Sequence, residues 1–138
     1  MSNRFHLAIA GGDLSITVPW YQTVLGCKLD MSEEGKWQDI DFWGNELTLH
    51  ATSPRYGKSL ERERYSVDMG DVYVPHFGIH LPLYRYNDVK DRVQAKAKFL
   101  DTPYTRFDNT RYQQETFFVE DPNYNVLEIK SMLKEKIY

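Results

Sequence analysis

The sequence predicts an α+β fold built from two βαβββ repeats. Each half of the chain has the same order: a segment of alternating apolar and polar residues, a helical segment, and then further alternating segments. A polar, charged stretch separates the halves, so an internal duplication is the simplest explanation. We expect one domain over residues 1–138, with repeat one at about 4–52, a linker at 53–73 and repeat two at about 74–132.

Repeat one begins with a predicted strand and a predicted helix. Residues 3–10 alternate an apolar set with a second set that contains His6, which is typical of a half-buried strand. Asp13 can cap a helix that runs to Leu25, and Gly26 is the expected left-handed residue after its end. The helix would cover one face of the sheet, and His6 would face the other side.

Two more strands complete repeat one. Residues 36–43 and 46–51 alternate again, and Gly44-Asn45 between them is a hairpin turn signal. On the second of these strands, His50 lies on the face opposite the leucines. We therefore expect His50 to point toward the cavity.

Repeat two follows the same order. Residues 72–81 predict one strand with His76 and His80 opposite its apolar face. Asn87 can cap the next helix, and residues 111–120 predict a further strand. Both histidines are expected to project into the cavity.

The last strand comes from the segment DPNYNVLEIK, residues 121–130. Its first three residues have turn chemistry, because Asp and Asn can bond their own backbone and proline fixes φ. Leu127 and Ile129 then predict the core face, so Glu128 points to the opposite face. A solvated carboxylate is the simpler interpretation of Glu128 taken alone.

Three side chains at these places predict a metal site. His6 and His76 hold equivalent positions in the two repeats, and Glu128 faces the same cavity. Two histidines and one carboxylate form a facial set that leaves coordination positions open, as in non-haem Fe(II), Mn(II) and Zn(II) sites. Each histidine alone would more simply be a core or surface residue, but the combination favours the metal.

Composition narrows the class of protein. The net charge of −3 and the pI near 5.8 argue against nucleic-acid binding, whose usual footprint is a basic patch. No apolar run approaches the roughly 18 residues of a membrane span, and no signal-peptide pattern is present. The single Cys27 fits a reducing compartment. We expect a cytoplasmic protein that binds a small molecule, with no nucleic acid and no membrane as partner.

Five segments of the chain resemble the vicinal oxygen chelate superfamily, which includes glyoxalases, extradiol dioxygenases and fosfomycin- or bleomycin-resistance proteins. The matching segments are FHLAI from Phe5, DLSITVPWYQTVLG from Asp13, GNELTLH from Gly44, VPHFGIHL from Val74 and DPNYNVLEIK from Asp121. The resemblance spans about residues 4 to 132 and is greatest to small proteins of the extradiol-dioxygenase kind. It implies a cupped, incompletely closed mixed sheet with helices outside, a metal in the concavity held by His6, His76 and Glu128, and a homodimer.

The resemblance also implies an activity. We expect a metal-dependent oxidoreductase, an extradiol-like dioxygenase acting on a small substrate that chelates the metal through neighbouring oxygens. Fe(II) is the expected metal, with Mn(II), Zn(II) or Ni(II) as alternatives. Thr48 stands where glyoxalase-like members often have a carboxylate, which favours a three-ligand site. A glyoxalase-like isomerase or lyase and a metal-free, bleomycin-resistance-like binding protein are the competing interpretations.

Four further residues are candidates for the chemistry. His50 or His80 could shuttle a proton, since the pKa of histidine is near neutral. Tyr112 could orient the substrate, and Arg106 in the loop TRFDN could pair with an anionic group. For His50, a polar wall residue and a fourth metal ligand are the alternatives, in that order. The simpler interpretations are a wall residue for His80, packing for Tyr112 and a solvated side chain for Arg106.

Overall fold

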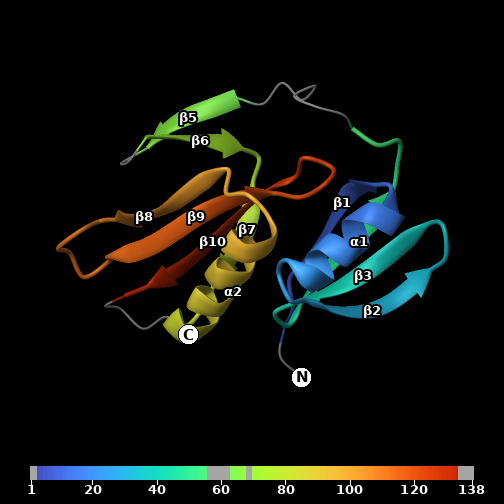
Figure 1. Cartoon of the computed structure of the whole chain (residues 1–138), viewed down its shortest axis with the longest axis horizontal. Helices are drawn as coiled ribbons and strands as arrows, with labels where there is room; N and C mark the ends of the chain where they lie inside the picture. The colour runs from blue at the N-terminus through green and yellow to red at the C-terminus, as the bar shows by residue number, and fades with distance from the viewer. Residues whose placement is uncertain (1–2, 56–62, 68–69, 134–138) are drawn as a thin grey trace. The chain divides into compact units, whose positions relative to one another are not determined.

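The computed structural model describes residues 3–55, 63–67 and 70–133. These residues form two helices and ten strands, which fall into two compact units (Figure 1). Unit 1 consists of Met1–Ser59 with Asp121–Asn125, and unit 2 of Leu60–Glu120 with Val126–Tyr138.

The predicted α+β class and the duplication are confirmed. Each unit holds a four-stranded sheet, in the orders β1-β4-β3-β2 and β7-β10-β9-β8. In both sheets the first strand is parallel to its neighbour, and the remaining pairs are antiparallel. The two repeats therefore have the same topology, strand by strand.

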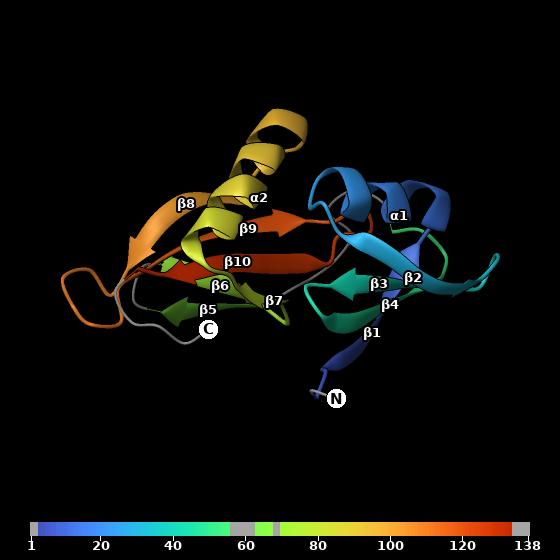
Figure 2. The ribbon, with the colours of Figure 1, turned by 90° about the horizontal axis from the view of Figure 1, so that it is seen from below.

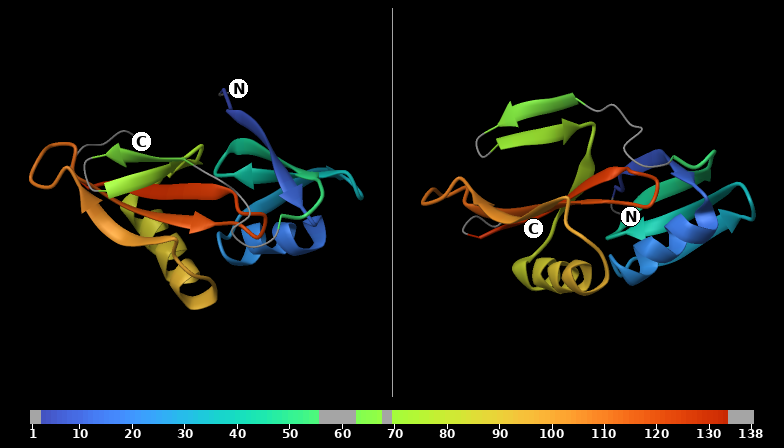
Figure 3. Two further views of the ribbon diagram at one scale, coloured as in Figure 1. Left: turned by 90° about the horizontal axis from the view of Figure 1, so that it is seen from above. Right: turned by 45° about the horizontal axis from the view of Figure 1, so that its top comes forward.

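Unit 1 carries its helix against one face of its sheet (Figure 3). Asp13 caps this helix as predicted, by accepting a hydrogen bond from the Ser15 backbone N–H. The helix ends at Thr23, two residues before the predicted Leu25, and Gly26 has the predicted positive φ, 75°. The elements are β1 (His6–Gly12), α1 (Leu14–Thr23), β2 (Lys28–Glu33), β3 (Trp37–Phe42) and β4 (Asn45–Ala51).

Two details of unit 1 differ from the expectation. The hairpin turns at Trp43-Gly44, both with positive φ, so that Phe42 pairs with Asn45 and the turn lies one residue earlier than predicted. Phe5 precedes β1 and its side chain is 67% exposed, although its backbone bonds to Asn45 and Glu46 of β4.

Unit 2 has three layers. Helix α2 lies on one face of the four-stranded sheet, and the β5–β6 hairpin lies over the other (Figures 2 and 3). Val72 of the hairpin packs there against Phe118 and Val126. The elements are β5 (Glu63–Val67), β6 (Gly70–Val74), β7 (Phe77–His80), α2 (Leu83–Lys96), β8 (Asp101–Arg106), β9 (Gln114–Glu120) and β10 (Val126–Met132).

Two expectations for repeat two are wrong. The single strand expected at 72–81 is two strands, β6 and β7, because Pro75 has no backbone N–H with which to continue a ladder. The second helix begins at Leu83 after Pro82, and Asn87 lies inside it. Fully buried Tyr86 anchors this earlier turn, so core packing extends the helix beyond the predicted cap.

The polar connector contains an unexpected hairpin, β5–β6, and the strand β8 was also not predicted. Parts of the connector, residues 56–62 and 68–69, lie outside the described residues. No described helix has the length and the apolar character that a membrane crossing requires.

Candidate functional site

The ladder of unit 2 places several polar side chains on one face of its sheet. Glu128 lies opposite Gly78 of β7, and Lys130 lies opposite His80 of β7 and Thr116 of β9. Opposed residues of a ladder share a face, so these groups lie together. This is the face turned away from α2, and the site is thus built on β7, β9 and β10.

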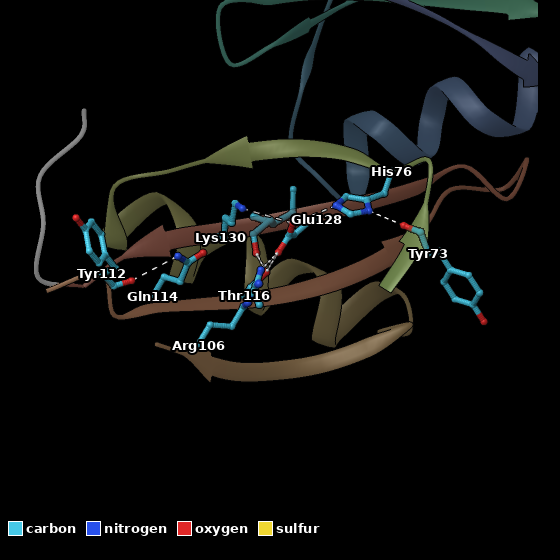
Figure 4. A network of polar contacts seen from close by, with 9 residues as sticks. Tyr73, His76, Arg106, Tyr112, Gln114, Thr116, Glu128 and Lys130 are labelled. Atoms are coloured by element: carbon cyan, nitrogen blue, oxygen red, sulfur yellow. Dashed lines mark hydrogen bonds and ion pairs between the residues drawn. The ribbon is translucent and has the colours of Figure 1, made fainter. Parts of the chain in front are cut away.

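Glu128 is the centre of the polar network (Figure 4). Thr116 Oγ1 donates a hydrogen bond of 2.7 Å to Oε2, and Arg106 Nη1 lies 3.6 Å from the same oxygen. His76 Nε2 lies 3.3 Å from Oε1, and Lys130 Nζ lies 3.6 Å from it. Burial alone would raise the pKa of Glu128, but these hydrogen bonds and the charge of Lys130 outweigh it and lower the pKa to about 2. Glu128 is therefore an anion.

The imidazole of His76 is held by both of its nitrogens. Nδ1 lies 2.5 Å from the Tyr73 carbonyl oxygen and must carry a proton there, since a carbonyl oxygen only accepts. Nε2 then faces the Glu128 carboxylate with a lone pair unless a cation or a second proton lies between them. The hydrogen bond to Glu128 raises the pKa of His76 and outweighs the opposite effect of burial, which favours a proton at this position when no cation is bound.

This arrangement fits a divalent metal. A metal-binding histidine commonly donates its other ring N–H to a carbonyl or a carboxylate, as His76 donates to Tyr73. Thr116 orients the carboxylate in the same way. His76 and Glu128 could thus both become ligands of an ion that replaces the proton between them.

A pocket of about 530 Å³ opens beside this pair. Within it, burial and the charge of Lys130 lower the pKa of His80, so this ring is neutral at pH 7. Nδ1 of His80 is buried and has no hydrogen-bond partner among the described residues. The pocket is lined by His76, Phe77, Gly78, Ile79, His80, Glu128 and Lys130.

In unit 1, His6 is also held through Nδ1. This nitrogen lies 2.7 Å from Glu46 Oε1, and Arg4 Nη2 lies 3.6 Å from the other oxygen of the same carboxylate. Because Nδ1 is committed to Glu46, Nε2 is the ring nitrogen with which His6 could bind a further partner. The roles of the two ring nitrogens are the same in His6 and His76.

The strand register shows that the two histidines are equivalent. Thr48 lies opposite Ala8, and Glu128 lies opposite Gly78. Each histidine precedes that partner by two residues, at positions 6 and 76. Thr48 therefore takes the place of Glu128 in unit 1, as the sequence comparison of the repeats predicts, and its hydroxyl donates to Asp39.

The structure brings two of the three predicted ligands together, His76 and Glu128, both in unit 2. His6 belongs to unit 1. In the described parts of the chain, no three His, Cys, Asp or Glu side chains are grouped closely enough to hold a metal.

The remaining predicted site residues have different surroundings. His80 lines the pocket, whereas His50 is exposed on β4 of unit 1. Tyr112 is 52% exposed just before β9, and its ring lies against the Arg111 guanidinium. Arg106 is not in a loop as predicted, because β8 extends to include it and directs it to Glu128.

Sequence reasoning missed two polar partners of Glu128. Lys130 shares the period-two face of Glu128, and this spacing was a usable signal. Thr116 gave no such signal, and neither did the Tyr73 carbonyl that binds His76.

Known structures with the same fold include enzymes and resistance proteins. The chain is 32% identical to a glyoxalase/bleomycin resistance protein/dioxygenase from Alicyclobacillus acidocaldarius, with a TM-score of 0.74 over 95% of this chain and 92% of that one. It is 16% identical to lactoylglutathione lyase from Agrobacterium tumefaciens (TM-score 0.62; 95% and 94% covered) and 14% identical to a fosfomycin resistance protein from Listeria monocytogenes (0.59; 95% and 92%). No protein-family model matches the chain, and no curated protein does.

The duplicated βαβββ fold and these structural neighbours are consistent with the vicinal oxygen chelate superfamily. The chain belongs to the glyoxalase/bleomycin resistance protein/dioxygenase family within it.

Proposed function

We propose that the chain is a metal-dependent dioxygenase of the extradiol type, which acts on a small substrate with two neighbouring oxygens. The observation that carries this proposal is the contact of His76 Nε2 with Glu128 Oε1 at 3.3 Å, with Nδ1 of the same ring committed to Tyr73. Two groups that both offer lone pairs face each other in this contact. Such a pair is suited to hold a cation.

His6 is the third ligand in this proposal, supplied by the same chain or by a second copy in a homodimer. Its position in the repeat is that of His76, and Glu46 holds its Nδ1 as Tyr73 holds that of His76. Fe(II) is the proposed metal, with Mn(II), Zn(II) and Ni(II) as alternatives. The bound ion would lower the pKa of a substrate hydroxyl and stabilise the resulting oxyanion.

The other residues of the pocket would handle the proton and the charge. His80 is neutral at pH 7 and lines the pocket, so it can accept the proton of a substrate hydroxyl. Thr116 holds Oε2 of Glu128 by a hydrogen bond and Arg106 lies near the same oxygen, which leaves Oε1 for the ion. His50 and Tyr112 stay predictions for acid–base and orienting roles.

Thr48 supports a three-ligand oxygenase over a glyoxalase-like enzyme. A threonine hydroxyl is a weaker metal ligand than a carboxylate, and this hydroxyl is already bonded to Asp39 at 2.6 Å. Unit 1 therefore offers His6 but no counterpart of Glu128.

The test is an oxygen-uptake screen with catechols on protein purified anaerobically and reconstituted with Fe(II). We expect uptake that is lost in Glu128→Gln and retained in Glu115→Gln, a change on the opposite face of the same sheet. A protein that consumes no oxygen but isomerises a glutathione adduct would be a glyoxalase-like enzyme. Tight binding of small molecules without metal or turnover would indicate a resistance-type binding protein.

A further inference from the structure

Lys130 has little to bind within the described part of the chain. Its ammonium lies 3.6 Å from Glu128 Oε1, which is longer than a hydrogen bond. The side chain is largely buried and lines the pocket beside His80, its partner in the ladder. A partly buried ammonium with unused N–H donors is a recognition group for an anion.

The charges around Lys130 point the same way. Glu128 is one carboxylate between two cations, Arg106 and Lys130. Two acidic residues of the described sheet, Asp101 and Glu120, lie toward the opposite end of this face: Asp101 pairs with Arg64 of β5, and Glu120 lies opposite Val126. Among the described residues that line the pocket, Glu128 is the one carboxylate and Lys130 the one ammonium, and a bound divalent ion would add positive charge.

We propose that Lys130 binds a carboxylate of the substrate, so that the substrate is a small acid whose two neighbouring oxygens lie close to this group. The proposal rests on the proposed function for the location of those oxygens. A pocket of about 530 Å³ is within the size range of small-molecule sites and accommodates a single-ring acid. A carboxylate there would accept the N–H donors that Glu128 does not reach.

The experiment measures binding to metal-free protein, so it does not depend on oxygen chemistry. The dissociation constant of 2,3-dihydroxybenzoate, whose carboxylate is adjacent to its two hydroxyls, is compared with that of catechol by calorimetry in the presence of a chelator. We expect the acid to bind about tenfold more tightly, which corresponds to one charge-assisted contact. Lys130→Gln and Lys130→Met should remove this preference, Lys130→Arg should keep it, and Lys90→Gln on the α2 face should leave it unchanged.

Equal affinity for the two probes, no measurable binding of the acid, or a preference that survives Lys130→Gln and Lys130→Met would overturn the proposal. The far-ultraviolet circular dichroism spectrum of each variant checks its fold. Failure of the dioxygenase proposal would be seen in a different way. The protein would bind no metal and consume no oxygen, whether or not it preferred the acid to catechol.

Discussion

A Cβ atom on Gly78 would lie 1.6 Å from the carbonyl oxygen of Glu128, which is far inside van der Waals contact. Strands β7 and β10 thus approach each other so closely at this pair that only glycine fits. The equivalent pair in unit 1, Ala8 and Thr48, accommodates a side chain. The close approach of two strands at this position is therefore found in unit 2, which contains Glu128.

Gly78→Ala should therefore damage the site as well as the fold. Since the clash is with backbone, β7 must move away from β10, and we expect a loss of about 1–3 kcal/mol in the free energy of unfolding together with weaker metal binding. Urea denaturation and metal titration measure the two effects. Ala8→Gly is the matched control and should cost only about 0.5–1 kcal/mol. Unchanged stability in Gly78→Ala would show that the strands are farther apart than described.

Thr116 orients the carboxylate through its 2.7 Å hydrogen bond to Glu128 Oε2. Thr116→Val keeps the shape but removes the donor, so we expect metal affinity to fall by about 10–100-fold. Thr116→Ser retains a hydroxyl and should stay within a few-fold of the wild type. Equal affinity in the valine and serine variants would rule out the orienting role.

The Glu128–His76 pair makes the stability of the metal-free protein depend on pH. The pKa of Glu128 is lowered to about 2 from 4.5, so its contribution is present above pH 4.5 and is lost as the pH falls toward 2. The pKa of His76 is raised from 6.5, so its contribution is complete below pH 6.5 and is lost as the pH rises through the folded value. The pair therefore stabilises most between about pH 4.5 and 6.5.

Denaturation of chelator-treated wild type and Glu128→Gln across this range measures the effect. We expect the difference in free energy to reach about 1–3 kcal/mol near pH 5.5 and to shrink in acid. A difference that is the same at pH 3 and pH 5.5 would contradict it.

The loop 121–125 is fixed to unit 1 by buried amide contacts. Asn123 Oδ1 accepts from the Arg55 N–H at 3.0 Å, and Asn123 Nδ2 donates to the Ala10 carbonyl at 2.9 Å. Asn123→Ala leaves the Arg55 N–H without its partner, whereas the Ala10 carbonyl keeps a second donor, Asn125 Nδ2 at 2.8 Å. We therefore expect a loss of about 1–2 kcal/mol in thermal or urea unfolding. Asn87→Ala, in the middle of α2, is the control and should change stability by well under 1 kcal/mol. Similar losses in both variants would count against this role of the loop.

The strands that were predicted from the sequence are those in which apolar and polar residues alternate. Leu127 and Ile129 are fully buried and place Glu128 on the opposite face, and Leu47 and Leu49 do the same for Thr48. The edge strands β2 and β8 were missed, because the residues of β2 are all exposed and β8 carries a proline. β2 alternates only weakly, with Leu29 and Met31 as its apolar residues, and both of these are exposed. β8 has no alternation.

Only those features of the candidate site that depend on the residue pattern within a single strand could be predicted. The equivalence of His6 and His76 follows from spacing along the chain, and the strand register agrees with it. The contacts of Arg106 and Thr116 with Glu128 depend on how β8 and β9 pair with their neighbours. Such pairing between distant segments leaves no mark in one sequence.

Metal content after reconstitution tests the central claim most directly. The protein is purified anaerobically, incubated with Fe(II), freed of unbound metal and examined by elemental analysis alongside Glu128→Gln, His6→Asn and Glu115→Gln. We expect about one iron per chain in the wild type and in Glu115→Gln, and a large loss in the other two variants. A wild type that retains none of Fe(II), Mn(II), Zn(II) or Ni(II), or a Glu128→Gln variant that retains full occupancy, would contradict the metal centre.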